Sequence, residues 1–236
     1  MKPYLPDKKA TLFIADTKIP GATIITPPSI GILPSSMQKH ADLGIVIISS
    51  QKAVCSPESY AYYRNALSPY GFEIIEGKNS VGRHYPEDSA YNVCVVGNKC
   101  FLNKNVCDER LYEILMSEGY EIIHINQGYA KCSICPIDEN TIITADPSIA
   151  KEAQKRGFEV LHISNDGIVL EGFPSGFFGG CTGMGGKNKL LVNGDIDTLP
   201  SGKEIRSFLR RKGIEIIQLK EGKITDIGSV LPLMTT

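Results

Sequence analysis

The stretch "GYEIIHI", Gly119 to Ile125, decides the fold, because the chain contains three close variants of it. The variants are "GFEIIEG" from Gly71, "GFEVLHI" from Gly157 and "GIEIIQL" from Gly213. In each copy the glycine predicts the end of a helix, where a left-handed residue is needed. The apolar pair predicts a strand that packs under that helix. The glutamate directly before this pair is expected to be solvated. Self-similarity within one chain indicates an architecture of structural repeats.

The copy at Gly157 shows what one unit contains. "KCSICPI" and "TIITA" have the composition of two strands, joined by the short turn "DEN". Asp146 followed by Pro147 predicts the start of a helix, which Gly157 ends. "FEVLHI" is the third strand, so the unit is strand, strand, helix, strand. In the last copy, Ser201 and Glu204 predict a capping box at the helix start.

Five such units account for the chain, which we predict to be a single α/β domain over residues 1–236. The predicted units cover about residues 10–31, 40–77, 88–125, 128–163 and 177–219. The first unit is short and lacks a clear helix. A closing strand at about residues 227–232 is expected to pair with this N-terminal unit.

Composition and charge narrow the function classes. The 236 residues carry 25 basic and 26 acidic side chains, so the charge gives no case for binding nucleic acid or an anionic membrane. No apolar run approaches the roughly 20 residues of a membrane helix, and the N-terminal residues lack an apolar signal region. We therefore expect a cytoplasmic protein. The seven cysteines are odd in number and predict no disulfide framework. The sequence leaves the oligomeric state open.

Five strand-strand-helix-strand units in a chain of this length resemble the pentein fold, in which five such units surround a pseudo-fivefold axis. "QGYAKCS", "GFFGGCTG" and "GDIDTLPSGKEI" look like an uncharacterised bacterial branch of that superfamily. Its catalytic members include deiminases, dimethylarginine hydrolases and amidinotransferases. They attack a guanidinium carbon with a cysteine thiolate, helped by a histidine and by acidic residues. Another branch, a ribosome-associated translation factor, keeps the fold without that chemistry, so the fold does not settle the function.

The resemblance implies that residues opening the first strand of each unit converge at the axis. Cys181 stands where the nucleophilic cysteine of the family is expected, and the small Gly180 beside it would leave room to bind a substrate. His40 and Asp42 open the second unit, and strand alternation would place both side chains on one face as an acid/base pair. The deiminases have a similar H-x-D, but in the unit just before the cysteine unit. A buried, inert Cys181 and a surface loop at His40 are the competing interpretations.

The remaining candidates would bind the substrate. Asp88 and Asn92 open the third unit and could hold a cation or an amide, or simply cap a turn. Lys131 opens the fourth unit and would bring a positive charge to the axis. Dimethylarginine hydrolases look like G-x-H-x-x-S at this point, whereas this chain has Ala130 in the histidine position. That departure puts a standard cysteine–histidine mechanism in doubt.

No cofactor or metal is predicted. The "CSIC" stretch, Cys132 to Cys135, has C-x-x-C spacing, but zinc would require a second such pair or nearby histidines. The glycines of "GGCTGMGG" lead into a strand-like segment, which does not fit a phosphate loop.

Two functional hypotheses remain open at this point. One is a cysteine-dependent hydrolase, similar to the amidinohydrolases and deiminases, acting on a small guanidino or other nitrogenous metabolite. The other is a non-catalytic protein that binds a metabolite or a partner on the same scaffold.

Overall fold

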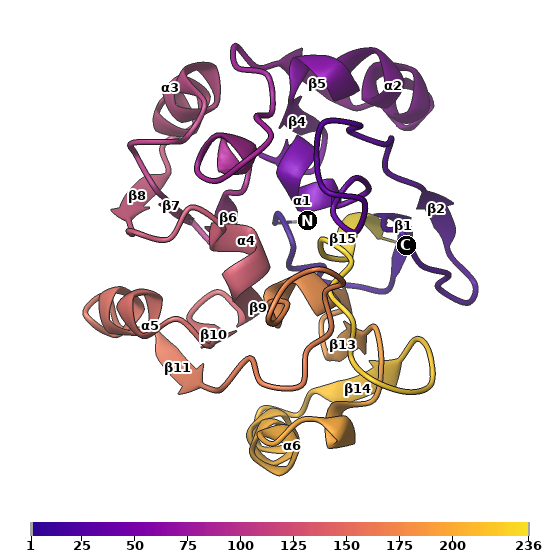
Figure 1. The fold of residues 1–236 in the computed structure, drawn as a ribbon, viewed down its shortest axis with the longest axis vertical. Helices are drawn as coiled ribbons and strands as arrows, with labels where there is room; N and C mark the ends of the chain where they lie inside the picture. The colour runs from indigo at the N-terminus through magenta and orange to yellow at the C-terminus, as the bar shows by residue number, and fades with distance from the viewer. Residues whose placement is uncertain (1, 236) are drawn as a thin grey trace.

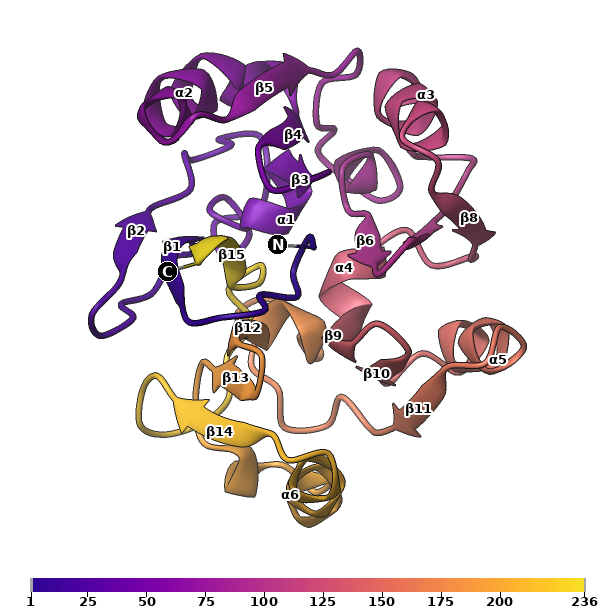
Figure 2. The same cartoon turned by 180° about the vertical axis from the view of Figure 1, so that it is seen from behind.

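Five three-stranded sheets surround a central axis in the computed structural model, which describes residues 2–235 (Figure 1). Each sheet has an inner, a middle and an outer strand; the inner strands lie nearest the centre, as Figure 2 shows. The inner strands are β3 (Ile45–Ile47), β6 (Cys94–Val96), β9 (Ile134–Asp138), β12 (Thr182–Gly186) and β15 (Leu231–Thr235). The middle strands are β4 (Lys52–Cys55), β7 (Lys99–Leu102), β10 (Thr141–Thr144), β13 (Lys189–Val192) and β1 (Ala10–Ile14). The outer strands are β5 (Glu73–Glu76), β8 (Glu121–His124), β11 (Glu159–His162), β14 (Glu215–Gln218) and β2 (Thr23–Ile25).

In four of the sheets a helix connects the middle strand to the outer strand and lies on the rim of the wheel (Figure 1). These helices are α2 (Pro57–Leu67), α3 (Glu109–Ser117), α5 (Pro147–Gln154) and α6 (Gly202–Arg211). The inner strand runs antiparallel to the middle strand, and the middle strand runs parallel to the outer one. The predicted strand-strand-helix-strand unit is therefore present as a pentein-like wheel.

The repeated joint has the structure that its sequence predicts. Gly71, Gly119, Gly157 and Gly213 all have positive φ values, between 68° and 81°. This left-handed conformation is one that side-chain-bearing residues rarely adopt, which explains the recurrence of glycine. The glutamate that follows opens each outer strand and is exposed in all four copies.

The first sheet closes the wheel by joining the two ends of the chain. β15 pairs antiparallel with β1, with Ile14 opposite Leu231, while β1 pairs parallel with β2. The N-terminal unit is short because its inner strand comes from the C-terminal end of the chain. Its middle and outer strands are connected without a helix.

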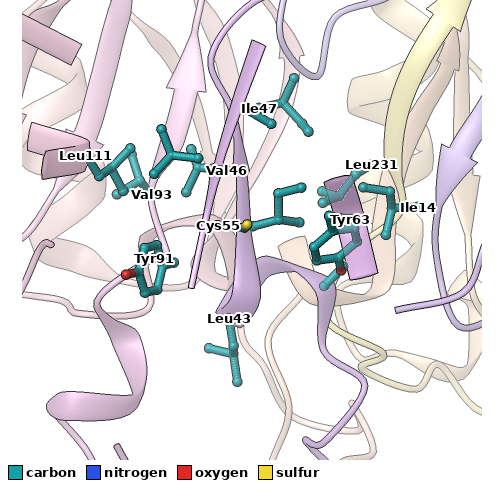
Figure 3. Packing of buried hydrophobic residues seen from close by; sticks show 14 of the residues in the cluster. Ile14, Leu43, Val46, Ile47, Cys55, Tyr63, Tyr91, Val93, Leu111 and Leu231 are labelled. Atoms are coloured by element: carbon teal, nitrogen blue, oxygen red, sulfur yellow. The ribbon is translucent and has the colours of Figure 1, made fainter. Parts of the chain in front are cut away.

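Apolar side chains fill the space between neighbouring sheets. Val46 of β3 lies on the same side as Val93 and Leu111 of the third unit, as Figure 3 shows. Tyr63 of α2 and Leu231 of β15 lie on the opposite side of the same sheet. All five side chains are buried. Because the second sheet is covered by apolar groups from both neighbours, its core depends on the closed ring.

Helix starts agree with the sequence in one case and differ in another. The Asp146 carboxylate accepts hydrogen bonds from the backbone N–H groups of Ser148 and Ile149, as a predicted N-cap should. The capping box at Ser201 was a wrong prediction, since its side chain makes no cap hydrogen bond. The Ser201 hydroxyl instead accepts from the backbone N–H of Ser164 and ties the helix to the preceding connection.

None of the helices between residues 2 and 235 combines the length and the apolar character needed to cross a bilayer.

Candidate functional site at the central axis

A short helical turn precedes most inner strands and sets the direction of the side chains at the axis. These turns are α1 (Ala41–Gly44), α4 (Ala130–Ser133) and the 3₁₀ turns η2 (Glu87–Ser89) and η3 (Gly179–Cys181); two more 3₁₀ turns, η1 (Ser68–Tyr70) and η4 (Ile196–Thr198), lie elsewhere in the chain. The expected strand geometry at His40 and Asp42 was wrong, because Asp42 lies within the helical turn α1 and His40 immediately precedes it. Both side chains are nonetheless buried, with 4% and 1% of their surface exposed.

We call the "hub" the buried polar cluster formed by His40, Asp42, Asn92, Lys131, Cys132, Asp226 and Ser229. Its members come from the openings of the inner strands of four different sheets. The openings therefore converge at the axis, as the repeat symmetry predicts.

Asn92 connects three of the sheets through its amide. Its Oδ1 accepts hydrogen bonds from the backbone N–H groups of Lys131, at 2.6 Å, and Cys132, at 3.1 Å. Its Nδ2 lies 3.1 Å from the Asp42 carbonyl oxygen and 3.0 Å from the Cys132 sulfur. Asn92 thus fixes the turn that carries Lys131 and Cys132 relative to α1.

Lys131 is buried and reaches the closing segment of the chain. Its Nζ donates to the Ser229 hydroxyl at 2.9 Å, and this hydroxyl donates to Oδ2 of Asp42. The Ser229 hydroxyl therefore bridges the Lys131 ammonium group and the Asp42 carboxylate. Such a hydrogen-bonded bridge satisfies two charged groups whose burial would be unfavourable if each were alone.

Cys132, His40 and Asp42 lie close together within the hub. One ligand-type atom from each lies within 4.8 Å of the other two. The Cys132 thiol donates to Oδ2 of Asp42 at 3.2 Å. Burial raises the pKa of this thiol well above its ordinary value, and the negative charges of Asp42 and Asp226 raise it further. The resting thiol is therefore protonated.

Asp226 faces the other side of the His40 ring. Its Oδ1 lies 3.9 Å from His40 Nδ1, and its carboxylate accepts hydrogen bonds from the backbone N–H groups of Phe177 and Gly228. Burial raises the pKa of Asp226, the nearby His40 opposes that rise, and Asp42 adds to it. Asp226 is the second carboxyl group that borders the imidazole.

Two glycines allow this close packing. Gly228 has φ 69°, and a Cβ at this position would lie 2.2 Å from the Cα of His40. A Cβ at Gly180 would lie 2.1 Å from Oδ1 of Asp226. Gly180, predicted as a substrate-binding residue, thus makes room for the Asp226 carboxylate. Its carbonyl also accepts a hydrogen bond from the backbone N–H of Ser229.

A cavity of about 220 Å³ opens onto the hub. Polar groups from His40, Cys132, Tyr129 and Asp226 line it, together with apolar and small side chains of Met37, Leu170, Phe173, Pro174, Ser175 and Phe177. The Tyr129 hydroxyl donates to Oδ2 of Asp88 at 2.6 Å. Asp88 therefore contacts a residue that lines the cavity but does not line the cavity itself. Burial raises the pKa of Asp88, while the Tyr129 hydrogen bond opposes that rise.

Cys181 lies at the opening of β12, where the sequence places it, but its thiol has different neighbours. The thiol donates to the Phe177 carbonyl oxygen at 3.1 Å, and the side chain packs in an apolar cluster with Met184 and Cys135. Burial raises the pKa of Cys181 well above its ordinary value. Its role as nucleophile stays a prediction.

The sequence interpretation included His40, Asp42, Asn92 and Lys131 but missed three hub residues. Cys132 was considered only within a C-x-x-C motif, although it opens the fourth unit. Asp226 and Ser229 precede the closing strand. Asp226 directly precedes the predicted closing strand, whereas Ser229 falls inside its predicted bounds because the observed strand β15 begins only at Leu231.

The fold has clear relatives among solved structures. A dimethylarginine dimethylaminohydrolase from Pseudomonas aeruginosa, a mutant in complex with citrulline, is 11% identical with a TM-score of 0.53, covering 90% of this chain and 92% of its own. An inosamine-phosphate amidinotransferase from Streptomyces griseus is 13% identical with a TM-score of 0.56, covering 92% and 76%. An agmatine deiminase from C. jejuni is 13% identical with a TM-score of 0.54, covering 90% and 76%. These similarities establish the pentein fold for this chain.

Sequence comparison gives the family. The model of the "Family of unknown function (DUF6873)" matches residues 10–231, so the chain belongs to that family. No curated protein matches the chain in sequence.

Proposed function

We propose that the hub is a thiol-dependent catalytic site acting on the C–N bond of a small guanidinium or amidinium compound. Cys132 is the nucleophile and His40 the general acid and base. The observation that carries the proposal is the mutual approach of Cys132, His40 and Asp42, within 4.8 Å, beside a cavity lined by two of them. A nucleophile, a base and a carboxylate that lie close together are the components of covalent catalysis.

The charge balance of the site favours a cationic substrate. Three carboxyl groups are buried around the axis, those of Asp42, Asp88 and Asp226, whereas Lys131 is the buried lysine among them. Asp226 lines the cavity, and its Oδ1 lies 3.9 Å from Nδ1 of His40. Burying carboxylates without compensation is unfavourable. A planar cation in the cavity would supply the missing positive charge and would donate its N–H groups to the Asp226 carboxylate.

The same cation would activate the thiol. A positive charge next to Cys132 favours the thiolate and opposes the burial and the carboxylates that raise its pKa. The thiol proton passes to His40. The thiolate then forms a C–S bond to the amidinium carbon, and the departing amine takes the proton from His40 as the C–N bond breaks. Water attacks the same carbon, gives its proton to His40, and breaks the C–S bond to restore the thiolate.

This assignment accounts for Ala130. Ala130 stands where dimethylarginine hydrolases have a histidine in the fourth unit. His40 brings an imidazole to the axis from the second unit instead. The cysteine comes from the fourth unit in place of the fifth. The names of the solved structures with this fold, a dimethylaminohydrolase, an amidinotransferase and an agmatine deiminase, support chemistry on guanidino compounds.

Binding without catalysis is the second candidate. The observation that favours it is the hydrogen bond that the Cys132 thiol donates to Asp42, at a position where burial raises the pKa of the thiol. A neutral thiol fixed in this way can be part of a binding site for a cation in which no covalent bond forms.

The test is turnover of a panel of guanidines and amidines, measured as released amine or ammonia. We expect Cys132→Ala to reduce turnover by at least on the order of 10³-fold, because it removes the nucleophile. We expect Cys181→Ala to change it by less than about threefold. Loss of activity in Cys181→Ala with retention in Cys132→Ala would move the nucleophile to the fifth unit. Absence of turnover, together with thermal stabilisation by the same cations, would support the binding function.

A further inference from the structure

We propose that His40, Asp42 and Cys132 also form a binding site for a thiophilic divalent cation, with Zn²⁺ as its natural type. The cation would bind the His40 imidazole, the Asp42 carboxylate and the Cys132 thiolate. Its fourth position would face the cavity. The inference uses the same side chains as the proposed enzyme but does not require catalysis.

The donor set fits zinc in kind and in spacing. Sulfur, imidazole nitrogen and carboxylate oxygen are the three ligand types that zinc takes in proteins, at about 2.0–2.3 Å each. In a tetrahedral site such ligand atoms lie roughly 3–4 Å from one another. The three atoms here already lie within 4.8 Å of each other. A small inward movement of the side chains would complete the site.

Two of the three side chains have a potential metal-binding atom that makes no hydrogen bond. Nε2 of His40 and Oδ1 of Asp42 are buried and have no hydrogen-bond partner among residues 2–235. Leaving a buried polar atom without a partner costs about 1–3 kcal/mol. A single cation between these atoms would satisfy both at once. The third ligand atom, the Cys132 sulfur, lies 3.2 Å from Oδ2 of the same Asp42 carboxylate.

Each ligand also has an outer partner on its other side. Asp226 lies at the Nδ1 side of His40, so the ring can offer Nε2 to the cation. The Ser229 hydroxyl holds Oδ2 of Asp42 and leaves Oδ1 free. Outer hydrogen bonds of this kind orient metal ligands and tune their basicity.

Asn92 supports the sulfur ligand. Its Nδ2 lies 3.0 Å from the Cys132 sulfur, in position to donate an N–H to a thiolate. Cation binding would displace the thiol proton, which is released to solvent. The site would then hold three negative charges, on Asp42, Asp226 and the Cys132 thiolate. Lys131 and a divalent cation would supply three positive charges, so the buried cluster would be neutral.

The C-x-x-C spacing has no part in this site. Cys135 lies in β9 and packs in the apolar cluster with Cys181, whereas the ligand group contains only Cys132 of that pair. Cys135 therefore serves as a matched control, since it is a neighbouring buried cysteine outside the ligand set.

Cobalt(II) titration of chelator-treated, reduced protein tests the site. We expect a thiolate-to-cobalt charge-transfer band and the visible bands of a tetrahedral site, saturating at a one-to-one ratio and displaced by Zn²⁺. Cys135→Ala should give the same spectrum. Cys132→Ser should lose the charge-transfer band, and His40→Ala should weaken binding by about 10–100-fold or more. Absence of the band in wild-type protein, or its survival in Cys132→Ser, would overturn the inference.

A second measurement does not depend on folding of the variants. In wild-type protein, Zn²⁺ should protect Cys132 from alkylation, quantified by peptide mass spectrometry, and leave the labelling of Cys107 unchanged. Equal labelling of Cys132 with and without Zn²⁺ would contradict the site. A protein that binds cobalt but turns over no guanidine or amidine would keep the metal site and exclude the proposed catalysis. A protein that turns over a guanidine or amidine but binds no cobalt would keep the proposed catalysis and exclude the metal site.

Discussion

The rim and the hub of the wheel are both built by repetition, but they repeat different things. At the rim the amino acids themselves recur, with a glycine of positive φ and an exposed glutamate in four copies. At the hub only the position recurs, and each unit places a different residue there, such as Asp42, Asn92, Cys132 and Ser229. The repeated amino acids specify the fold. The residues that differ between units create a site with several chemical groups, which identical units would not provide.

The two cysteines Cys132 and Cys181 extend that comparison into the hub. Both are buried, and burial raises the pKa of both thiols. Cys132 contacts Asn92 and Asp42 from other units, whereas Cys181 donates to the Phe177 carbonyl within its own segment. A place at the axis is therefore shared by many residues. The two thiols differ in the partners that neighbouring units supply to them.

The largest contrast between hub and rim is expected for two glycine substitutions. Gly228→Ala should destabilise the protein by more than about 3 kcal/mol, because it combines left-handed strain with a clash against the His40 backbone. Gly213→Ala, at a similar φ of 68° but with no atom within 4 Å of the added Cβ, should cost only about 1–2 kcal/mol. Urea unfolding of both variants measures the difference. Equal losses would show that the hub is not tightly packed.

The pH dependence of stability should reveal the buried carboxyl of Asp226. Its pKa is raised in the folded protein, so the folded state binds more protons than the unfolded state above the ordinary Asp value of about 3.9. Its contribution to stability is therefore largest at low pH and is lost as pH rises through the raised pKa. Asp226→Asn should make the unfolding free energy fall less between pH 4 and pH 7 than in wild type.

The control for this prediction is a carboxylate at the rim. Glu215→Gln leaves the hub unchanged and should keep the wild-type pH slope. If Asp226→Asn and wild type gave parallel curves, Asp226 would have an ordinary pKa and the charge argument for a cationic ligand would lose its main support.

The smallest effect is expected for the repeated glutamates. Glu215 is exposed, and its carboxylate lies 3.5 Å from Nζ of Lys189 on the neighbouring strand. Glu215→Gln should change the free energy of unfolding by less than about 0.5 kcal/mol, since exposed ion pairs contribute little. Asp42→Asn, the matching change at the hub, should cost more, because it alters the acceptor shared by Ser229 and Cys132. A rim effect equal to the hub effect would contradict the comparison.

The sequence predicts the wheel well because its signals are local. Helix ends at glycine, the Asp146 cap and the alternation of strands and helices all depend on a few neighbouring residues. The inner strand of the first sheet was harder to assign, since β15 becomes part of that unit only through pairing with β1. The Ser201 cap failed because a distant backbone group, the N–H of Ser164, takes its hydroxyl.

The site could be predicted only in part for the same physical reason. Position within the repeat was enough to bring His40, Asp42, Asn92 and Lys131 to the axis. It could not show that Cys132, in a helical turn, meets His40 and Asp42, because that contact joins residues of different units. The Cys132 thiol donates to Asp42 of another unit, whereas the Cys181 thiol donates within its own segment.

The central claim is that Cys132 is the reactive thiol of a cation-binding hub, and site-resolved labelling tests it most directly. Folded protein is treated at neutral pH with an amidinium electrophile, 2-chloroacetamidine, and with uncharged iodoacetamide, and the labelled cysteine peptides are quantified by mass spectrometry over time. The account predicts that Cys132 reacts faster than Cys181, and that the cationic reagent increases this preference. Faster labelling of Cys181, or labelling of Cys132 no faster than that of the other buried cysteines, would contradict it.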